Sequence, residues 1–131
     1  MKLAATIATA LLLLVDAFQL ALAFGAPWGH LAWGGRHAGT LPARLRIASG
    51  IAGVVIYPLI VAFVLGSAGR IRAFWPSRAR RGGMWLLAAL FSVGTLANLA
   101  SPSAGERYWG PVSLAIVVCC GVIARGAGDR T

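Results

Sequence analysis

The chain has 131 residues, of which 59% are hydrophobic and only 11% are charged, and its formal net charge is +9. A soluble domain is nearer ~45–50% apolar and ~25% charged, so this composition excludes an ordinary soluble domain. The basic residues lie between long apolar runs. The positive charge therefore indicates membrane topology and contact with membrane lipids, and it does not indicate nucleic-acid binding. We expect one membrane domain over residues 1–131.

Four apolar segments follow one another along the chain and predict transmembrane helices at about residues 3–24, 45–65, 84–100 and 108–124. A helix needs ~20 apolar residues to cross ~30 Å of hydrocarbon. The fourth segment is short of this length unless it begins at Tyr108, which places Pro111 in the first turn, where a missing N–H costs little. Pro58 predicts a kink in the second helix. The predicted fold class is an all-α integral membrane bundle of four transmembrane helices.

The distribution of basic residues predicts the orientation. If the N-terminus is inside, eight of the 12 basic residues lie on the cytoplasmic side, which the positive-inside rule favours, so both termini are predicted to be cytoplasmic. Five of the eight belong to the linker between the second and third helices: Arg70, Arg72, Arg78, Arg80 and Arg81. These five are candidates for binding anionic lipid headgroups, although a role in orientation alone explains them as well.

The N-terminal segment also resembles a secretory signal peptide. Lys2 precedes an apolar run, and the small-x-small triplet Ala21-Leu22-Ala23 follows it. Cleavage after Ala23 would leave three helices. The apolar run continues past Asp16 to Phe24, which is longer than the apolar part of a typical signal peptide, so we favour a retained first helix.

The first outer loop, residues 25–43, holds five glycines and two prolines, which argues against a regular helix. Pro27, Trp28 and Trp33 in this loop, together with Trp109, are predicted to lie at the outer membrane interface, where tryptophan is enriched.

Two short signatures are similar to a known family. The stretches Gly25-Ala26-Pro27-Trp28-Gly29 and Trp33-Gly34-Gly35 resemble the outer-loop signature, GAPWG…WGG, of a family of uncharacterised small bacterial membrane proteins. Residues 98–101 and 106–111 resemble a second signature of the same family. The resemblance implies a four-helix protein of the bacterial plasma membrane and implies no activity.

A polar seam is predicted between the first and third helices. Asp16 and Gln19 share one face of the first helix, and Ser92, Thr95 and Asn98 form a stripe on the third. A carboxylate inside a membrane span costs roughly 2.5–3.5 kcal/mol on insertion scales, so Asp16 should face the bundle and meet Thr95 and Asn98. The seam either joins the helices, at ~0.6 kcal/mol per hydrogen bond, or forms a proton- or cation-coupled site at Asp16.

Other candidate sites are weaker. Cys119 and Cys120 are neighbours on a helix, which disfavours a disulfide between them, and we interpret them as packing residues. His30, His37 and Glu106 lack the spacing of a zinc site.

We see no nucleophile-and-base pair and no phosphate-binding loop, so neither an enzyme nor a cofactor is expected. The small residues Ser49 and Gly53 form a face for either internal packing or homo-oligomer formation. The sequence favours a structural or partner-binding membrane component, with a small-solute or proton-coupled transporter using Asp16 as the alternative.

Overall fold

The computed structural model describes residues 1–128, which are helical over most of their length. Four helical segments are long and apolar enough to cross a membrane: Lys2–Ala23, Ala43–Ser67, Ser77–Leu99 and Ala104–Ala127. The only β-pairing among the described residues is an isolated bridge between Trp28 and Gly39. The predicted class, an all-α bundle of four membrane-spanning helices, is confirmed.

The first helix matches its predicted range to within one residue, whereas the third begins well before its apolar segment. The first is α1 (Lys2–Ala23), and the third is α4 (Ser77–Leu99), which begins well before the expected residue 84. Its early start follows from Pro76, whose extended backbone forms the N-cap, and from the arginines after it, which are good helix formers. Hydropathy therefore located the section suited to the membrane, and the helix itself continues past it.

The last span is interrupted near its start. The fourth span, predicted at about residues 108–124, begins earlier with the single-turn helix α5 (Ala104–Arg107), which is followed by α6 (Trp109–Gly128). Ser103 caps α5 by accepting a 3.4 Å hydrogen bond from the Glu106 N–H. The cap satisfies one of the N–H groups that a helix start leaves unpaired.

The second span consists of α2 (Ala43–Ile51), the π turn η3 (Ala52–Ile56) and α3 (Tyr57–Ser67). Pro58 has no N–H, and its ring crowds the carbonyl four residues earlier. The Tyr57 N–H bonds to Ala52 O, five residues back, so the chain widens by a π turn just before the proline. The irregularity predicted at this position takes that form.

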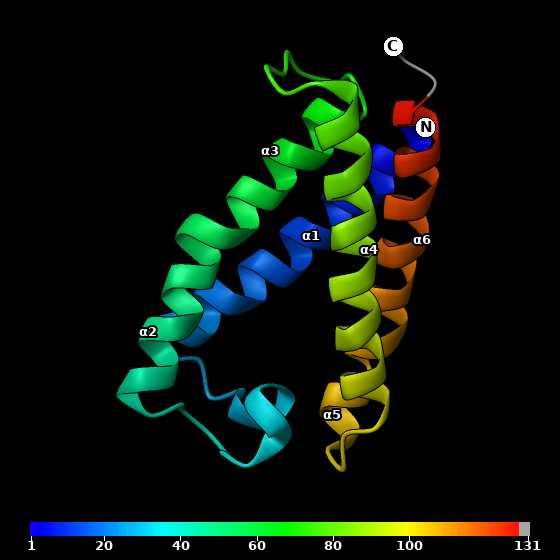
Figure 1. The fold of residues 1–131 in the computed structure, drawn as a ribbon. Helices are drawn as coiled ribbons and strands as arrows, with labels where there is room; N and C mark the ends of the chain where they lie inside the picture. The colour runs from blue at the N-terminus through cyan, green and yellow to red at the C-terminus, as the bar shows by residue number, and fades with distance from the viewer. Residues whose placement is uncertain (129–131) are drawn as a thin grey trace.

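Figure 1 shows how the segments are arranged. Helices α4 and α6 run side by side, while α1 packs on α6 and on the rod formed by α2, η3 and α3. The rod lies near α4 at one end and leans away from it at the other. We call the first the terminal end, because it holds Met1, the connection after α3 and the end of α6. The other is the loop end, formed by residues 24–42 and 100–108.

Small side chains form the contact between α1 and α6. The core there consists of Ala4, Ala5, Ala8 and Leu12 with Ile116, Cys120, Ile123 and Ala124, all buried. Small residues let helix backbones approach closely, which is the main source of helix association in a membrane. Cys119 and Cys120 are buried and carry free thiols, in keeping with their interpretation as packing residues.

The face formed by Ser49 and Gly53 is an internal packing surface. Both residues are buried, and a Cβ on Gly53 would lie 2.6 Å from Leu20 Cδ2 of α1. Gly50, beside them, faces Ala23 of the same helix. The sequence allowed either internal packing or oligomer formation for this face. In the structure α1 packs on it, so the face is internal.

Candidate binding cavity at the loop end

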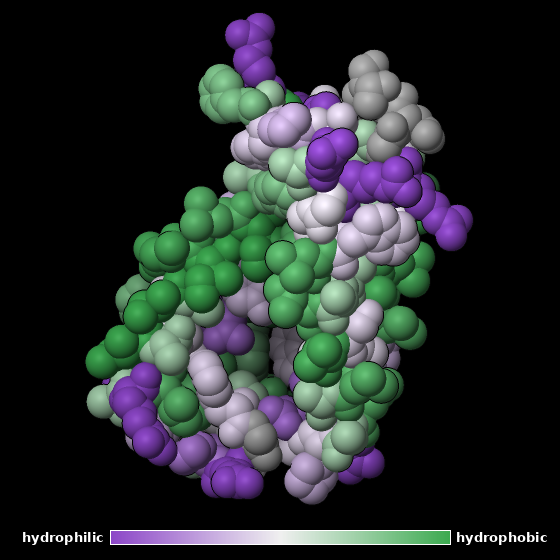
Figure 2. Space-filling model, viewed as in Figure 1, coloured by the Kyte–Doolittle hydropathy of each residue, from purple (hydrophilic) through white to green (hydrophobic). Residues whose placement is uncertain are grey.

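A cavity of about 260 Å³ lies at the loop end, between the rod and the α4–α6 pair. Figure 2 shows the molecule hollowed between these two halves, with hydrophilic atoms beside the hollow and apolar surface around it. Twelve residues line the cavity, from α1, the first loop, the start of α3, α4, α5 and α6. Most of the chain's elements therefore contribute to one site.

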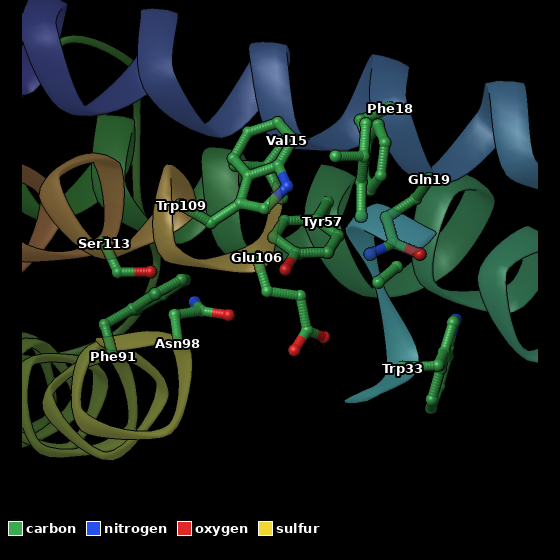
Figure 3. A pocket seen from close by; sticks show the side chains of 12 residues that line it. Val15, Phe18, Gln19, Trp33, Tyr57, Phe91, Asn98, Glu106, Trp109 and Ser113 are labelled. Atoms are coloured by element: carbon green, nitrogen blue, oxygen red, sulfur yellow. The ribbon is translucent and has the colours of Figure 1, made fainter. Parts of the chain in front are cut away.

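Polar groups converge on this cavity from four helices and the start of α3. Figure 3 shows the side chains of Gln19, Tyr57, Asn98, Glu106 and Ser113 pointing toward its centre. The Oε1 atom of Gln19 is buried without a hydrogen-bond partner in the protein. Because buried polar groups are normally hydrogen-bonded, this carboxamide is suited to a ligand that donates a hydrogen bond.

The carboxyl group in the cavity belongs to Glu106, which is only 8% exposed. The Ser101 hydroxyl donates a hydrogen bond to it. Ser103, the cap of α5, donates from its own hydroxyl to His30 O at 2.7 Å and so ties α5 to the first loop. The first bond positions the carboxyl group directly, and the second fixes the short helix that carries it.

Aromatic rings form much of the remaining wall. Phe18, Trp33, Phe91 and Trp109 all line the cavity. Phe18 lies between two tryptophans: its ring centroid is 4.7 Å from that of Trp109 and 6.3 Å from that of Trp28, with which it stacks. The Trp33 indole N–H donates to the Ser49 hydroxyl at 3.1 Å, which fixes the first loop to α2.

The four residues predicted at the outer interface therefore divide into two pairs. Pro27 and Trp28 are exposed at the loop end, as an interfacial position requires. Trp33 is 44% exposed but also lines the cavity, and Trp109 is only partly exposed and lies against Phe18. Their depth in a bilayer stays a prediction.

Glycines let the first loop fold tightly over the cavity. A Cβ on Gly29 would lie 2.3 Å from His37 O and 2.6 Å from Gly39 O. Gly35 has a φ of +69°, and a Cβ there would lie 2.5 Å from Ser103 Cβ. Neither position accommodates a side chain without moving backbone, which explains why this loop is rich in glycine.

The polar seam is formed only in part. Gln19 and Asn98 face the same cavity, as the sequence predicted for the two helices. The Ser92 and Thr95 hydroxyls instead donate to carbonyls of their own helix, Ala88 O at 2.7 Å and Phe91 O at 2.8 Å. Serine and threonine commonly satisfy themselves in this way, so they need no partner on another helix.

Asp16 does not meet Thr95 or Asn98, and that expectation is corrected. Its Oδ1 atom is buried without a hydrogen-bond partner in the protein. The same atom lies 3.4 Å from the position that a Cβ would take on Gly53, so the carboxyl group is turned toward the rod. The physical reason is the packing: α1 lies against the rod and α6, whereas α4 packs mainly on α6.

The five candidate headgroup arginines lie on the connection after α3 and the first turns of α4, at the terminal end. Arg70 donates to Lys2 O at 3.0 Å and to the Thr6 hydroxyl at 2.6 Å, which joins this connection to α1. Arg72, Arg78 and Arg81 are exposed, and Arg80 is partly exposed. Lipid contact by these residues stays a prediction.

The sequence signal for Glu106 was present but not used. Ser103 and Glu106 have the S-x-x-E spacing of a capping box, which indicates the start of a helix. Glu106 would then lie in the first helical turn, where the helix sets the direction of its side chain. Ser113 follows Trp109 by one turn and therefore shares its face of α6. Tyr57 gave no signal, because its approach to the cavity depends on how the rod packs. In residues 1–128 no three His, Cys, Asp or Glu side chains are grouped to hold a metal ion.

No family model, no curated protein and no solved structure matches this chain. Its four apolar helices make it a multi-pass membrane protein.

Proposed function

We propose that this protein is a non-enzymatic, partner-binding component of the bacterial plasma membrane, with both termini cytoplasmic, that binds a small polar ligand in the loop-end cavity. The observation that carries the proposal is the convergence of Gln19, Asn98, Glu106 and Ser113 on one cavity with aromatic walls. Binding sites for small molecules are concave, mostly apolar and supplied with a few convergent polar groups.

The composition of the lining favours binding over chemical conversion. The described residues around the cavity include two carboxamides, which donate and accept hydrogen bonds but do not titrate. Among the described lining residues there is no histidine, cysteine or lysine to pair with Ser113 as a base or to act as a nucleophile. The volume of about 260 Å³ is just below the ~300–1,000 Å³ of drug-sized sites, so the ligand is small.

Thiol accessibility tests the proposal. We expect Ser113→Cys to react with small water-soluble methanethiosulfonates in nanodiscs, because position 113 lines the cavity. The matched control is Val118→Cys on the same helix, whose side chain is 59% exposed on the apolar surface and should be covered by lipid. The wild-type protein gives the background, since Cys119 and Cys120 are buried. Equal protection of positions 113 and 118 would show that the cavity is closed to ligands and would refute the proposal.

One observation favours a second candidate, a proton-coupled transporter of small solutes. The buried Asp16 Oδ1 lacks a partner in the protein, and Asp16 lies three residues before Gln19, which lines the cavity. An intramembrane acid of this kind is a functional candidate by default. Proteoliposomes containing a pH-sensitive dye should then report a change of internal pH when a gradient of a probe solute, here the small organic cation choline, is imposed, and Asp16→Asn should abolish the response. A wild-type protein that moves no protons excludes this candidate.

A further inference from the structure

We infer that the cavity selects a cation of the ammonium class: a primary amine or a quaternary ammonium headgroup. The juxtaposition that carries this inference is one buried carboxyl group, that of Glu106, surrounded by aromatic rings. The inference rests on the proposed function, because it names the chemistry of the ligand for the same cavity.

The charge of the lining favours a cation. Its described residues include Glu106 but no lysine or arginine. None of the arginines near the loop end, Arg36, Arg44, Arg46 and Arg107, is among the lining residues. Arg46 donates to Ala23 O at 3.2 Å, and Arg107 donates to Ser103 O and Pro102 O, both at 3.5 Å. An anionic ligand would meet this carboxyl group within the same cavity, and like charges brought together in a desolvated site repel strongly.

The aromatic rings favour the same ligand. Phe18, Trp33, Trp109 and Tyr57 border the cavity on several sides. Ring faces attract cations, tryptophan most strongly, and aromatic cages are the usual recognition device for methylated ammonium groups.

The ligand has two possible sources, which share one headgroup chemistry. A soluble amine such as choline reaches the cavity from water, and the headgroup of phosphatidylethanolamine reaches it from the bilayer. The hollow in Figure 2 lies at the surface of the bundle, with hydrophilic atoms beside it and apolar surface around it, so it is open to a ligand from either source. The experiment below separates them.

The test compares reagents of opposite charge on one thiol. Ser113→Cys in nanodiscs of phosphatidylglycerol is reacted with trimethylammonium-ethyl and with sulfonato-ethyl methanethiosulfonate, and each rate is divided by that for free 2-mercaptoethanol. We expect the cationic reagent to be favoured about tenfold, the factor that ~1.4 kcal/mol of differential binding produces. In Glu106→Gln the preference should fall to about that of an exposed thiol at Ala38→Cys, which corrects for the anionic bilayer.

Further arms separate the sources and guard against misfolding. Choline, but not its neutral analogue 3,3-dimethylbutanol, should slow labelling of Ser113→Cys by a neutral methanethiosulfonate if the ligand is soluble. Replacing phosphatidylglycerol by phosphatidylethanolamine should slow it if the ligand is a lipid. Because Glu106 also bonds to Ser101, Glu106→Gln can disturb α5, so Trp33→Leu serves as the second variant and should weaken choline protection while leaving the carboxyl group in place.

The outcomes distinguish the two proposals. Protection by choline or by phosphatidylethanolamine, with a cationic preference that Glu106→Gln removes, supports the inference. Labelling by both charged reagents at equal corrected rates, without protection by either amine, overturns it and leaves the cavity as a site for a neutral ligand. A thiol at position 113 that reacts with neither reagent refutes the proposed function itself.

Discussion

Replacing Gly53 by alanine should destabilise the bundle by forcing α1 away from the rod. The new Cβ would lie 2.6 Å from Leu20 Cδ2 and 2.8 Å from Leu20 Cγ. Carbon atoms are comfortable at ~3.5–4.0 Å, so the overlap is about 1 Å. The Cδ2 methyl can swing aside, but Cγ is attached near the backbone, and relief requires a new rotamer or a wider helix separation.

The magnitude follows from two opposing effects. Overpacking of a tight site costs ~1–3 kcal/mol, and alanine gains up to ~1 kcal/mol over glycine within a helix. We expect Gly53→Ala to lose about 1–2 kcal/mol of unfolding free energy. Gly50→Ala is the matched control, because its Cβ would meet only Ala23 Cβ, at an ordinary 3.6 Å. That variant should be neutral or slightly stabilised.

The assay is unfolding by sodium dodecyl sulfate in mixed micelles, followed by far-UV circular dichroism. Leu20→Ala in the Gly53→Ala background removes the clashing atoms, so the two substitutions should be non-additive by about 1 kcal/mol or more. If Gly53→Ala is as stable as Gly50→Ala, or if its effect simply adds to that of Leu20→Ala, the close approach of α1 to the rod is wrong.

Three further predictions follow from the same contacts. Trp33→Phe should lower the unfolding free energy by about 0.5–1.5 kcal/mol in the same assay, the usual contribution of a hydrogen bond, because the donor to Ser49 is lost. If adding Ser49→Ala to Trp33→Phe lowers it further by the full effect of Ser49→Ala alone, the two residues do not share a hydrogen bond. Asp16→Asn should leave the unfolding free energy unchanged or raise it, because Oδ1 has no protein donor to lose. A decrease of more than ~1.5 kcal/mol in the unfolding free energy would reveal hydrogen bonds to the carboxylate. A cysteine at Ala38, which is exposed in the first loop, should react with an impermeant reagent added outside intact cells, and labelling only from the cytoplasmic side would reverse the orientation.

The candidate site was predictable only in part, because its parts depend on different kinds of information. Gln19 and Asn98 were expected to face each other because helical spacing assigns each to a polar face, and both do line the cavity. Thr95 failed as a partner for Asp16 because its hydroxyl bonds to Phe91 O, a local alternative that spacing alone does not exclude. Glu106 lies in a segment that the sequence predicts as a loop, where no helical spacing shows which way a side chain points. Its direction follows only from α5.

The sequence by itself determined the class of the protein and the number of its spans. Hydropathy is a local sum over about 20 residues, and within a membrane each helix must form its own backbone hydrogen bonds. A span can therefore be recognised without knowing which helices pack beside it. Only the tertiary structure decided which faces meet. Lipid is as apolar as leucine, so no hydrophobic force selects a partner for each helix. The choice was made by fit, such as Gly53 against Leu20, and this fit placed α1 beside the rod and left Glu106 inside a cavity.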